Sequence, residues 1–438
     1  MKRVAVFGTG YVGCVTAACL SRDGHQVIGV DIDAEKVAAL NEGKSPVAEP
    51  GLEELVAEQV AAGRLRATED FEQAIRETQI AMIAVGTPSD HAGAVSTAAL
   101  EKVICSIGQT LRGTDQSYTV VIRSTLLPGI LETSLAPMLA EAADSVLGER
   151  IRICNNPEFL RESIAIRDYD APPFVVVGAV AGTEADDVMA LYDAIDAEKI
   201  VTDTYTAALL KYGCNAYHAL KIGFANEMGA LAKAFGANGQ QVMELLCRDT
   251  KLNVSKAYLR PGFSFGGSCL PKDVRALTRY AEEQALKISI LRSVLPSNQE
   301  HLDRAIRIIE DRGVRKIGMV GLSFKSGTDD LRESPFVTLA ETLVGRGYDM
   351  KIYDPGISVS RLKGGNLAYI DQRLPHLAAL LVEKPENLTD HAELLVLGNE
   401  IADGLDLTSH RSEDIIDLRC CLVVAERESA NSATIAEV

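Results

Sequence analysis

The first 31 residues constrain the fold more than any other part of the chain. An apolar stretch at residues 3–7 is followed by Gly8-Thr-Gly10-Tyr-Val-Gly13, then by a run of small residues with helical character, and then by a second apolar stretch that ends at Asp31. Three glycines at this spacing between a strand and a helix, with an acidic residue about 20 positions on, are typical of a dinucleotide-binding βαβ unit. The alternative, a turn without a cofactor, is the weaker interpretation.

Each glycine has a separate task in such a unit. Gly8 makes the tight turn, Gly10 lets a pyrophosphate approach the helix N-terminus, and Gly13 allows the helix to pack closely on the strand. Asp31 would accept a hydrogen bond from the ribose 2′-OH, so we expect NAD rather than NADP as the cofactor.

Strand and helix patterns alternate from there to about residue 180. We expect helices near 51–61 and 97–111, and strands at 80–85, 118–123, 150–154 and 174–178. This alternation predicts a parallel sheet covered on both faces, which binds ligands beyond the carboxyl ends of its strands. Thr87, Thr125 and Glu158 fall at such ends. They are either ordinary turn residues or ligand contacts, and the predicted crevice favours contact.

From about residue 203 to 248 the apolar residues follow a helical period, with one long helix expected at 205–235. Lys211, Asn215 and His218 are spaced by four and three positions and so share one face of that helix. Such a stripe is either a polar seam between helices or one wall of a site, and the spacing leaves both open.

A second α/β segment follows, with strands expected at 315–322, 350–354, 393–398 and 414–418 and a helix at 335–345. It lacks a full glycine fingerprint, but its loop 323–332 carries Lys325 and Arg332, which suit phosphates; the alternative is a solvated loop. We therefore predict an α/β chain of two Rossmann-like doubly wound domains, 1–202 and 301–438, joined by a long-helix region at 203–300. The tail beyond about residue 425 is expected to be poorly ordered.

Composition excludes several functions for this 438-residue chain. A net charge of −17 and the absence of Trp argue against a nucleic-acid partner. No apolar run reaches the roughly 18 residues of a membrane span, and a first strand that begins at Lys2 leaves no room for a signal peptide. We expect a cytoplasmic protein without a membrane partner. Nine cysteines without the paired spacing of a zinc site predict reduced thiols and no metal.

One cysteine differs from the rest in its surroundings. Cys269 follows Gly266-Gly-Ser and precedes a helix opened by Pro271. The unpaired N–H groups of a helix N-terminus, together with Lys272, stabilise a thiolate, and the glycines let the backbone approach a ligand closely. A buried structural cysteine is the alternative, but this context favours a nucleophile.

These motifs together resemble the nucleotide-sugar 6-dehydrogenases, a family that includes UDP-glucose and GDP-mannose dehydrogenases. The resemblance runs in order from residue 1 to about 400 and rests on Gly8-x-Gly-Tyr-Val-Gly13, Gly86-Thr-Pro88, Ser124-Thr-x-x-Pro-Gly129, Asn156-Pro-Glu-Phe-Leu-Arg-Glu162, Lys211-x-x-x-Asn215, Gly266-Gly-Ser-Cys-x-Pro-Lys-Asp273 and Phe324-Lys325. Beyond about residue 400 the chain departs from the pattern. His218, Leu270 and the run 327–335 favour the GDP-mannose branch, which serves alginate-type polysaccharide synthesis.

The resemblance implies an NAD-dependent four-electron oxidation of a sugar C6 alcohol to a carboxylate. Lys211, Asn215 and a water held by Asp273 would assist the first hydride transfer. Cys269 would then capture the aldehyde as a thiohemiacetal and carry it to a thioester, which water positioned by Glu158 would hydrolyse.

The resemblance also implies the binding residues and the assembly. For the cofactor these are Gly8, Gly10, Tyr11, Val12, Gly13, Asp31, Lys36, Thr87, Thr125, Lys272 and Arg332. For the nucleotide sugar they are Glu162, Lys211, Asn215, His218, Asn226, Ala257, Tyr258, Arg260, Phe263, Gly266 and Lys325. Family members form homodimers with shared active sites, so Asn226 would serve the partner's site, and higher assemblies remain open.

Three rival functions are compatible with part of this pattern. A UDP-glucose or UDP-N-acetyl-sugar 6-dehydrogenase would share the catalytic residues and differ at the base and sugar contacts. A two-electron hydroxyacid dehydrogenase would not need Cys269 or the second α/β half. A non-catalytic sensor of NAD or sugar nucleotides would have no use for the catalytic set.

Overall fold

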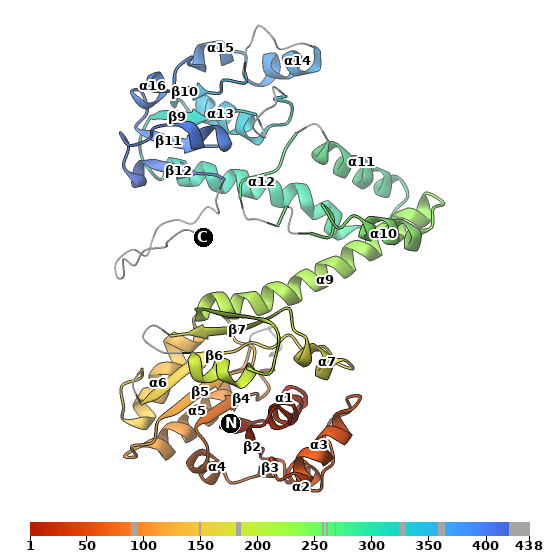
Figure 1. The fold of residues 1–438 in the computed structure, drawn as a ribbon. Helices are drawn as coiled ribbons and strands as arrows, with labels where there is room; N and C mark the ends of the chain where they lie inside the picture. Colours follow the sequence, from red (N-terminus) through yellow and green to blue (C-terminus); the bar gives the residue numbers. More distant parts are fainter. Residues whose placement is uncertain are drawn as a thin grey trace. The chain divides into compact units, whose positions relative to one another are not determined.

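The computed structural model describes residues 1–88, 95–148, 150–180, 185–255, 258–259, 262–267, 269–323, 330–357 and 364–419. The chain divides into two compact units, Met1–His218 and Ala219–Val438 (Figure 1). Each unit is described by itself. Cys420, Cys421 and the tail expected to be poorly ordered lie outside the described residues.

The N-terminal unit is built on a sheet of eight strands within its described residues. In the order in which they lie side by side, the strands are β3 (Leu65–Thr68), β2 (Gln26–Val30), β1 (Arg3–Phe7), β4 (Ile80–Ile83), β5 (Tyr118–Ile122), β6 (Ile151–Asn155), β7 (Phe174–Ala179) and β8 (Glu198–Asp203). The ladders from β3 through β6 are parallel. The first strand therefore lies inside the sheet, where both of its faces are covered.

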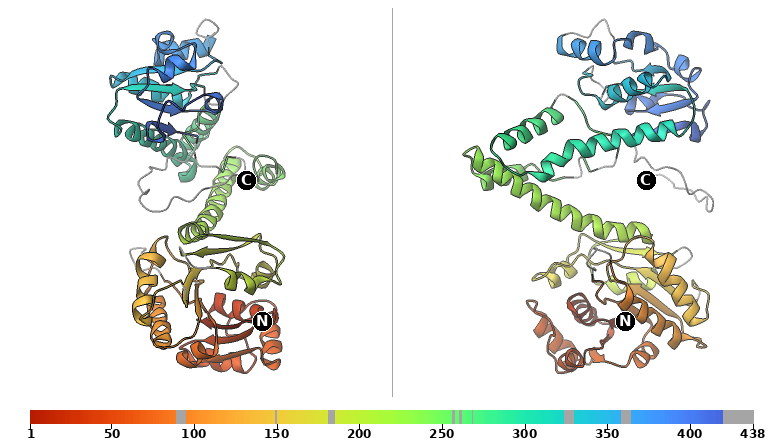
Figure 2. Two further views of the ribbon diagram at one scale, coloured as in Figure 1. Left: turned by 60° about the vertical axis from the view of Figure 1, so that its left-hand side comes forward. Right: turned by 180° about the vertical axis from the view of Figure 1, so that it is seen from behind.

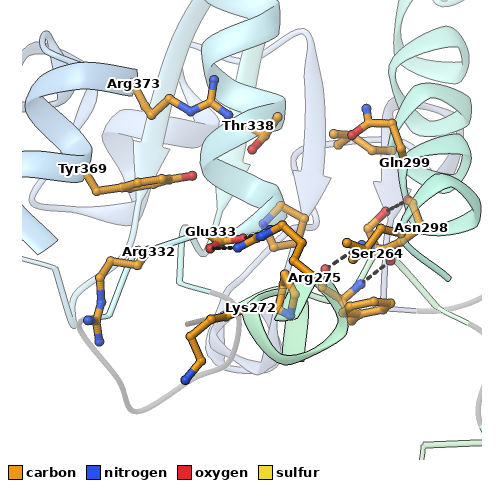
Figure 3. A pocket seen from close by; sticks show the side chains of 15 residues that line it. Ser264, Lys272, Arg275, Asn298, Gln299, Arg332, Glu333, Thr338, Tyr369 and Arg373 are labelled. Carbon is orange, nitrogen blue, oxygen red and sulfur yellow. Dashed lines mark hydrogen bonds and ion pairs between the residues drawn. The ribbon is translucent and has the colours of Figure 1, made fainter. Parts of the chain in front are cut away.

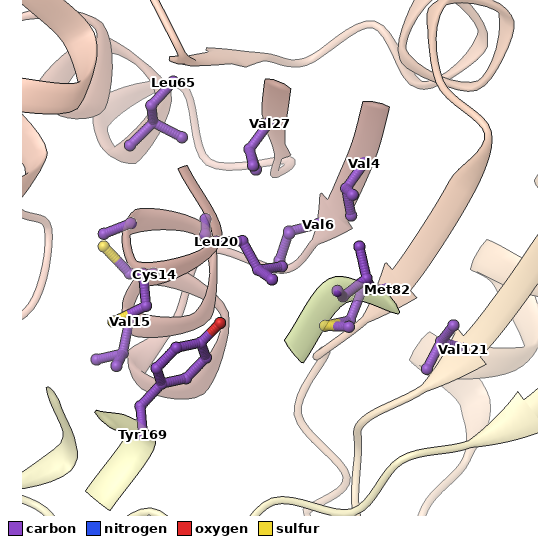
Figure 4. Close-up of a cluster of buried hydrophobic side chains, with 14 of the residues drawn as sticks. Val4, Val6, Cys14, Val15, Leu20, Val27, Leu65, Met82, Val121 and Tyr169 are labelled. Atoms are coloured by element: carbon purple, nitrogen blue, oxygen red, sulfur yellow. The ribbon is translucent and has the colours of Figure 1, made fainter. Parts of the chain in front are cut away.

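Side chains of β1 alternate between two separate cores. Val4 and Val6 pack on one face among residues of α1 and α3 (Figure 4), whereas Ala5 and Phe7 pack on the other face among residues of α5 and α6. Burial on both faces explains why these strands read as continuous apolar runs. The helices of the unit are α1 (Tyr11–Arg22), α2 (Ala34–Asn41), α3 (Leu52–Ala61), α4 (Phe71–Glu77), α5 (Ala98–Leu111), α6 (Ala136–Ala143), α7 (Ala165–Asp170) and α8 (Asp186–Met189), with a π-helical turn at Leu131–Leu135 and a 3₁₀ turn at Ala190–Tyr192.

The expectation of a wholly parallel sheet is wrong at one ladder. Strand β7 pairs antiparallel with β6, through Cys154 opposite Ala179 and Asn155 opposite Gly178. Residues 156–173, which connect these strands, contain only the six-residue helix α7, whereas a parallel crossover is usually made by a longer α-helix. Strands β3 and β8 were not expected from the sequence. The edge strand β8 is largely exposed and so lacks the apolar run that marks the others.

Helix α9 (Thr204–Ala234) is 31 residues long and crosses the boundary between the two units (Figure 1 and Figure 2). In the C-terminal unit it is followed by α10 (Gly239–Arg248), α11 (Leu270–Glu283) and α12 (Ser289–Glu310). Leu231 of α9 packs against Ala281 of α11 and Leu291 of α12. The Phe235 ring stacks on Tyr280 with centroids 3.7 Å apart. These contacts hold α11, which begins directly after Cys269.

The C-terminal unit also contains a parallel sheet, ordered β10 (Asp349–Tyr353), β9 (Lys316–Val320), β11 (Leu394–Leu397) and β12 (Ile415–Asp417). Its remaining helices are α13 (Pro335–Gly345), α14 (Gly364–Arg373), α15 (Leu377–Leu380) and α16 (Pro385–Thr389), with 3₁₀ turns at Glu400–Gly404 and Ser412–Asp414. A turn at Gly321, with φ +85°, follows β9, and Asp354 after β10 accepts a hydrogen bond from Leu322 N at 2.8 Å. This repeats the arrangement of Gly8 and Asp31 in the first unit, so the expected pair of Rossmann-like halves is confirmed.

No helix among the described residues is long and apolar enough to cross a membrane. No group of three or more His, Cys, Asp or Glu side chains among them is arranged to hold a metal ion.

Candidate active site

The glycine turn after β1 has the geometry that a bound dinucleotide needs. Gly8 adopts φ +90°, in the left-handed region that favours glycine. A Cβ on Gly13 would lie 1.8 Å from the carbonyl oxygen of Gly8, whereas a Cβ on Gly10 would meet no atom within 4 Å. The turn is therefore closed on the side of the helix and open at Gly10, where the N–H groups of α1 begin.

Asp31 lies at the end of β2 and is fixed by the same turn. Its Oδ2 accepts hydrogen bonds from the N–H of Thr9 at 2.7 Å and from the Thr9 hydroxyl at 2.8 Å, and its Oδ1 accepts from Asp33 N at 3.0 Å. Burial alone would raise the pKa of Asp31, but the hydrogen bonds from Thr9 and Asp33 outweigh it and lower that pKa. The carboxylate is thus charged and held in place to accept a ribose hydroxyl.

A cavity of about 570 Å³ adjoins this turn, and the residues that line it include the expected cofactor contacts Gly8, Gly10, Asp31 and Lys36. The Lys36 ammonium lies 4.0 Å from Asp31 Oδ2. Beside this edge of the sheet, the Thr87 hydroxyl donates to the Thr125 carbonyl at 3.3 Å. Tyr11 and Val12 lie in the first turn of α1. An open helix N-terminus, a carboxylate and a cavity of this size fit a dinucleotide.

Glu158 and Lys211 meet although 53 positions separate them. Lys211 Nζ donates to Glu158 Oε1 at 2.8 Å, and the two side chains are 9% and 11% exposed, respectively. The ammonium also lies 5.7 Å from the centre of the Phe159 ring. A nearly buried acid–base pair next to a strand end can exchange a proton with a substrate hydroxyl.

The rest of the polar stripe on α9 differs in exposure from Lys211. Asn215 and His218 are exposed, and Asn226 is exposed three turns beyond Asn215. His218 and Glu158 line a cavity of about 350 Å³ in the N-terminal unit. Lys211 is covered by the segment after β6, whereas the next turns of the helix are open to a ligand.

A buried network beneath Glu158 was missed by the sequence analysis. Arg123 Nη1 donates to Asn156 Oδ1 at 2.8 Å and to the Tyr192 hydroxyl at 3.2 Å, and Arg123 is only 5% exposed. Asn156 Nδ2 in turn donates to the Val176 carbonyl at 2.7 Å. This network fixes the backbone directly before Glu158. The available signal was the position of Arg123 immediately ahead of the Ser124-Thr125 pair.

Glu49 is a second buried residue that the sequence analysis missed. Its carboxylate accepts hydrogen bonds from the Tyr11 hydroxyl, from Ser163 N at 2.8 Å and from Ala165 N at 2.7 Å. Burial and the Glu49 carboxylate raise the pKa of Tyr11. Glu49 thereby ties the segment that carries the exposed Glu162 to the first turn of α1.

Cys269 lies exposed at the N-cap position of α11, unlike the thiols of the core. Burial raises the pKa of Cys14 to about 11 and that of Cys154 to about 12, so these two thiols stay protonated. The charge of Arg332 interacts with the Cys269 sulfur. Lys272 Nζ lies 3.4 Å from Asp273 Oδ1, and both side chains are exposed in the first turn of α11. The C-terminal unit thus holds an accessible thiol among cations.

The remaining expected substrate contacts lie near this thiol in the sequence. Phe263 packs on Phe336 with ring centroids 5.1 Å apart, Tyr258 is exposed with φ 61°, and Gly266 lies against the carbonyl of Glu333. Ala257, Arg260 and Lys325 lie outside the described residues. The structure brings Glu158 together with Lys211, and it brings the loop that carries Arg332 against the glycines before Cys269, each within its own unit.

Comparison with known proteins assigns most of the chain. Residues 2–196, 205–300 and 318–423 match the NAD binding domain, the central domain and the UDP binding domain of the UDP-glucose/GDP-mannose dehydrogenase family. A GDP-mannose 6-dehydrogenase of Pseudomonas putida is 46% identical over 418 residues, or 95% of each chain.

Two solved structures extend the match to the fold. A ternary complex of GDP-mannose dehydrogenase from Pseudomonas aeruginosa has a TM-score of 0.91 and 43% identity, covering 95% of this chain and 96% of that one. A UDP-glucose dehydrogenase from Pyrobaculum islandicum has a TM-score of 0.56 and 34% identity, covering 96% and 94% of the two chains. The chain therefore belongs to the UDP-glucose/GDP-mannose dehydrogenase family and is an NAD-dependent nucleotide-sugar dehydrogenase.

Proposed function

We propose that this protein oxidises the C6 alcohol of GDP-mannose to a carboxylate, giving GDP-mannuronate. The observation that carries the proposal is the exposed Cys269 at the N-cap position of α11. A dehydrogenase that stops at the aldehyde needs no nucleophile, whereas one that continues to the acid gains from holding the aldehyde covalently. The overall reaction consumes one alcohol, two NAD⁺ and one water, and yields a carboxylate, two NADH and three protons.

In the first oxidation, C6 of the alcohol would lose a hydride, for which a bound NAD would supply the acceptor. The proton of the alcohol would pass to a water held by Asp273. The Lys211–Glu158 pair, 2.8 Å apart and nearly buried, supplies an ammonium that stabilises the developing oxyanion and a carboxylate that keeps this ammonium in place. Asn215, one turn further along α9, adds a hydrogen-bond donor. Asp273 would hold the water that completes the proton path.

In the second oxidation, the Cys269 thiolate attacks C6 of the aldehyde and forms a thiohemiacetal. Loss of a second hydride from C6 leaves a thioester on the same sulfur. Water positioned by Glu158 adds to the thioester carbonyl, the C–S bond breaks, and the thiolate is restored. The sulfur thus retains the reactive aldehyde between the two steps.

The preference for GDP-mannose rests on the relatives. The Pseudomonas putida protein at 46% identity bears that name, whereas the UDP-glucose dehydrogenase structure is 34% identical. We assign NAD binding to residues 1–202 with help from Lys272 and Arg332, the catalytic cysteine and dimer contacts to 203–300, and the sugar nucleotide to 301–438. The sugar-nucleotide contacts are those expected from the sequence: Glu162, Lys211, Asn215, His218, Asn226, Ala257, Tyr258, Arg260, Phe263, Gly266 and Lys325.

We further propose a homodimer whose subunits share their active sites. Large apolar side chains are exposed on α9 and in the residues that follow it, among them Leu220, Ile222, Phe235, Leu245 and Leu252. Exposed apolar side chains that gather on one surface are typical of an interface with another chain. Light scattering coupled to gel filtration should give twice the chain mass of 47.0 kDa. A mass of one chain at micromolar concentration contradicts the proposal.

The deciding experiment counts NADH formed per sugar nucleotide consumed, with GDP-mannose and UDP-glucose in separate reactions. Two NADH per GDP-mannose, with little from UDP-glucose, supports the proposal. The reverse preference would make a UDP-sugar the substrate and would leave the proposed chemistry unchanged. One NADH per sugar would exclude the thioester route, and no NADH from any nucleotide sugar would favour a sensor. Cys269→Ser should abolish carboxylate formation while NAD binding persists.

A further inference from the structure

A bidentate ion pair joins α11 to the loop that precedes α13. The Arg275 guanidinium donates Nη1 to Glu333 Oε2 at 2.9 Å and Nη2 to Glu333 Oε1 at 2.6 Å (Figure 3). Two parallel hydrogen bonds fix the orientation of both groups as well as their separation. The Arg275 side chain is 51% exposed and that of Glu333 is 34% exposed, and pairs so exposed add little to global stability. We therefore expect this pair to act mainly on the local positions of α11 and of the loop that precedes α13.

Glu333 also contacts the glycines ahead of Cys269, through its backbone. Gly267 N donates to the Glu333 carbonyl at 3.2 Å. A Cβ on Gly266 would lie 2.3 Å from the same carbonyl oxygen, so the two segments touch without room for a side chain. Glu333 adopts φ 52°, a conformation that a residue other than glycine keeps only when its surroundings impose it.

The loop around Glu333 is anchored from its other side by α13. The Ser334 side chain is fully buried, its hydroxyl donates to the Leu322 carbonyl at 2.7 Å, and it accepts from Phe336 N at 3.3 Å. Pro335 follows as the first residue of the helix. The loop is therefore held in place, and the glycines that precede Cys269 pack against it.

These contacts close a ring that includes the thiol. The ring runs from the Glu333 carbonyl to Gly267, along the chain to Cys269, along α11 to Arg275, and back to the Glu333 carboxylate. The same loop carries Arg332, whose charge acts on the Cys269 sulfur. The Arg332 guanidinium is itself held by Asp330 at 2.7 Å. Breaking the Arg275–Glu333 ion pair would open the ring and remove this side-chain link between α11 and the loop.

We propose that Arg275 and Glu333 are positioning residues, which set the place of the Cys269 thiol relative to the loop that carries Arg332. This inference rests on the proposed function, in which Cys269 is the nucleophile. Neither residue needs to touch the substrate. Their loss slows capture of the aldehyde by the thiol.

The test compares Arg275→Met and Glu333→Gln with a matched control on the same helix. Arg279 pairs with Glu283 at 2.8 Å, one turn further along α11 and more exposed, and neither of these residues takes part in the ring. Arg279→Met therefore removes an equivalent ion pair without opening the ring. Glu333→Gln retains the backbone carbonyl, so it reports on the side-chain link even if Arg275→Met folds poorly.

The first readout needs no substrate. Purified protein is treated with iodoacetamide over a range of pH, and modification of the Cys269 peptide is followed by mass spectrometry. Both ring variants should react at Cys269 more slowly than wild type, because the ring no longer fixes the thiol at the N-terminus of α11 beside the loop that carries Arg332. Arg275→Lys, which keeps the charge and loses the fork, should lie between wild type and Arg275→Met.

The second readout is turnover of GDP-mannose. A misplacement on the order of 1 Å lowers rates by up to about a hundredfold, so kcat for carboxylate formation should fall by roughly tenfold or more while KM stays within about twofold. Alkylation profiles of the ring variants that match Arg279→Met would overturn the positioning role. Absence of turnover in every protein, wild type included, would instead count against the proposed function and leave the alkylation comparison valid.

Discussion

Two alanine substitutions in the glycine turn should separate fold stability from cofactor binding. In Gly13→Ala the new Cβ lies 1.8 Å from the carbonyl oxygen of Gly8, and real Cβ contacts essentially never fall below 3.0 Å. The turn or α1 must therefore move by about 1 Å, and strain of this kind in a packed interior costs about 1–3 kcal/mol. Gly13 is buried at the first turn of α1, so the strain reaches the core formed around Val4 and Val6.

Gly10→Ala is the matched control, since its Cβ meets no protein atom within 4 Å. Its free energy of unfolding should stay at the wild-type value or rise by a few tenths of a kcal/mol, because alanine restricts the unfolded chain. The open space at Gly10 is where a pyrophosphate would lie against the helix N-terminus. A methyl group there should weaken NAD binding by about tenfold or more.

Urea unfolding and NAD titration, followed by fluorescence and calorimetry, measure the two effects on the same preparations. The expected pattern is a loss of stability with Gly13→Ala and a loss of affinity without a loss of stability with Gly10→Ala. Wild-type NAD affinity in Gly10→Ala would refute the placement of the pyrophosphate. Wild-type stability in Gly13→Ala would refute the contact between Gly13 and Gly8.

Two further predictions concern buried charges. Asp31→Ala leaves two donors of Thr9 without an acceptor and should cost roughly 1–3 kcal/mol at pH 7. Because the folded-state pKa of Asp31 is lowered, the stability that this carboxylate contributes is complete above the ordinary value of 3.8 and is lost as the pH falls through the folded value. Urea unfolding should therefore show that the difference in unfolding free energy between wild type and Asp31→Ala shrinks toward pH 3. Lys211→Met leaves the Glu158 carboxylate nearly buried and without its ammonium partner, so this change should cost up to about 3 kcal/mol of unfolding free energy. Adding Glu158→Gln should restore most of that stability but should not restore NADH production. A single variant as stable as the double would contradict the pairing.

Local signals in the sequence predicted much of the fold. Helix α13 spans Pro335–Gly345 as expected, because Pro335 suits the first helical turn and Ser334 caps it. Helix α9 spans Thr204–Ala234, within a residue of the expected bounds at each end, because its apolar period continues without a break. The turn at Gly8 and the carboxylate at Asp31 also follow from spacing alone. In each case the residues that decide the structure are neighbours in the sequence.

Contacts between distant segments could not be predicted in this way. The direction of β7 depends on whether the chain crosses the sheet after β6, and an alternation of strands and helices does not encode that. The ion pair of Arg275 with Glu333 and the buried position of Arg123 depend on tertiary packing. The roles of the individual site residues remain predictions. The sequence placed Lys211 on a polar stripe of α9, but only the structure shows that Glu158 covers it while Asn215 stays exposed.

The two Rossmann-like halves share a topology but differ in how each can hold a phosphate. In the first half, Gly10 precedes α1 and has no side chain to cap it, so the N–H groups of the first turn are available to a pyrophosphate. In the second half, Ser334 caps α13 by accepting from Phe336 N, and Gly266 and Gly267 pack against the backbone of Glu333 directly before that helix. The N-terminus of α13 is thus already used by the protein. We therefore expect side chains such as Lys325 and Arg332, rather than this helix N-terminus, to bind a diphosphate in the second half.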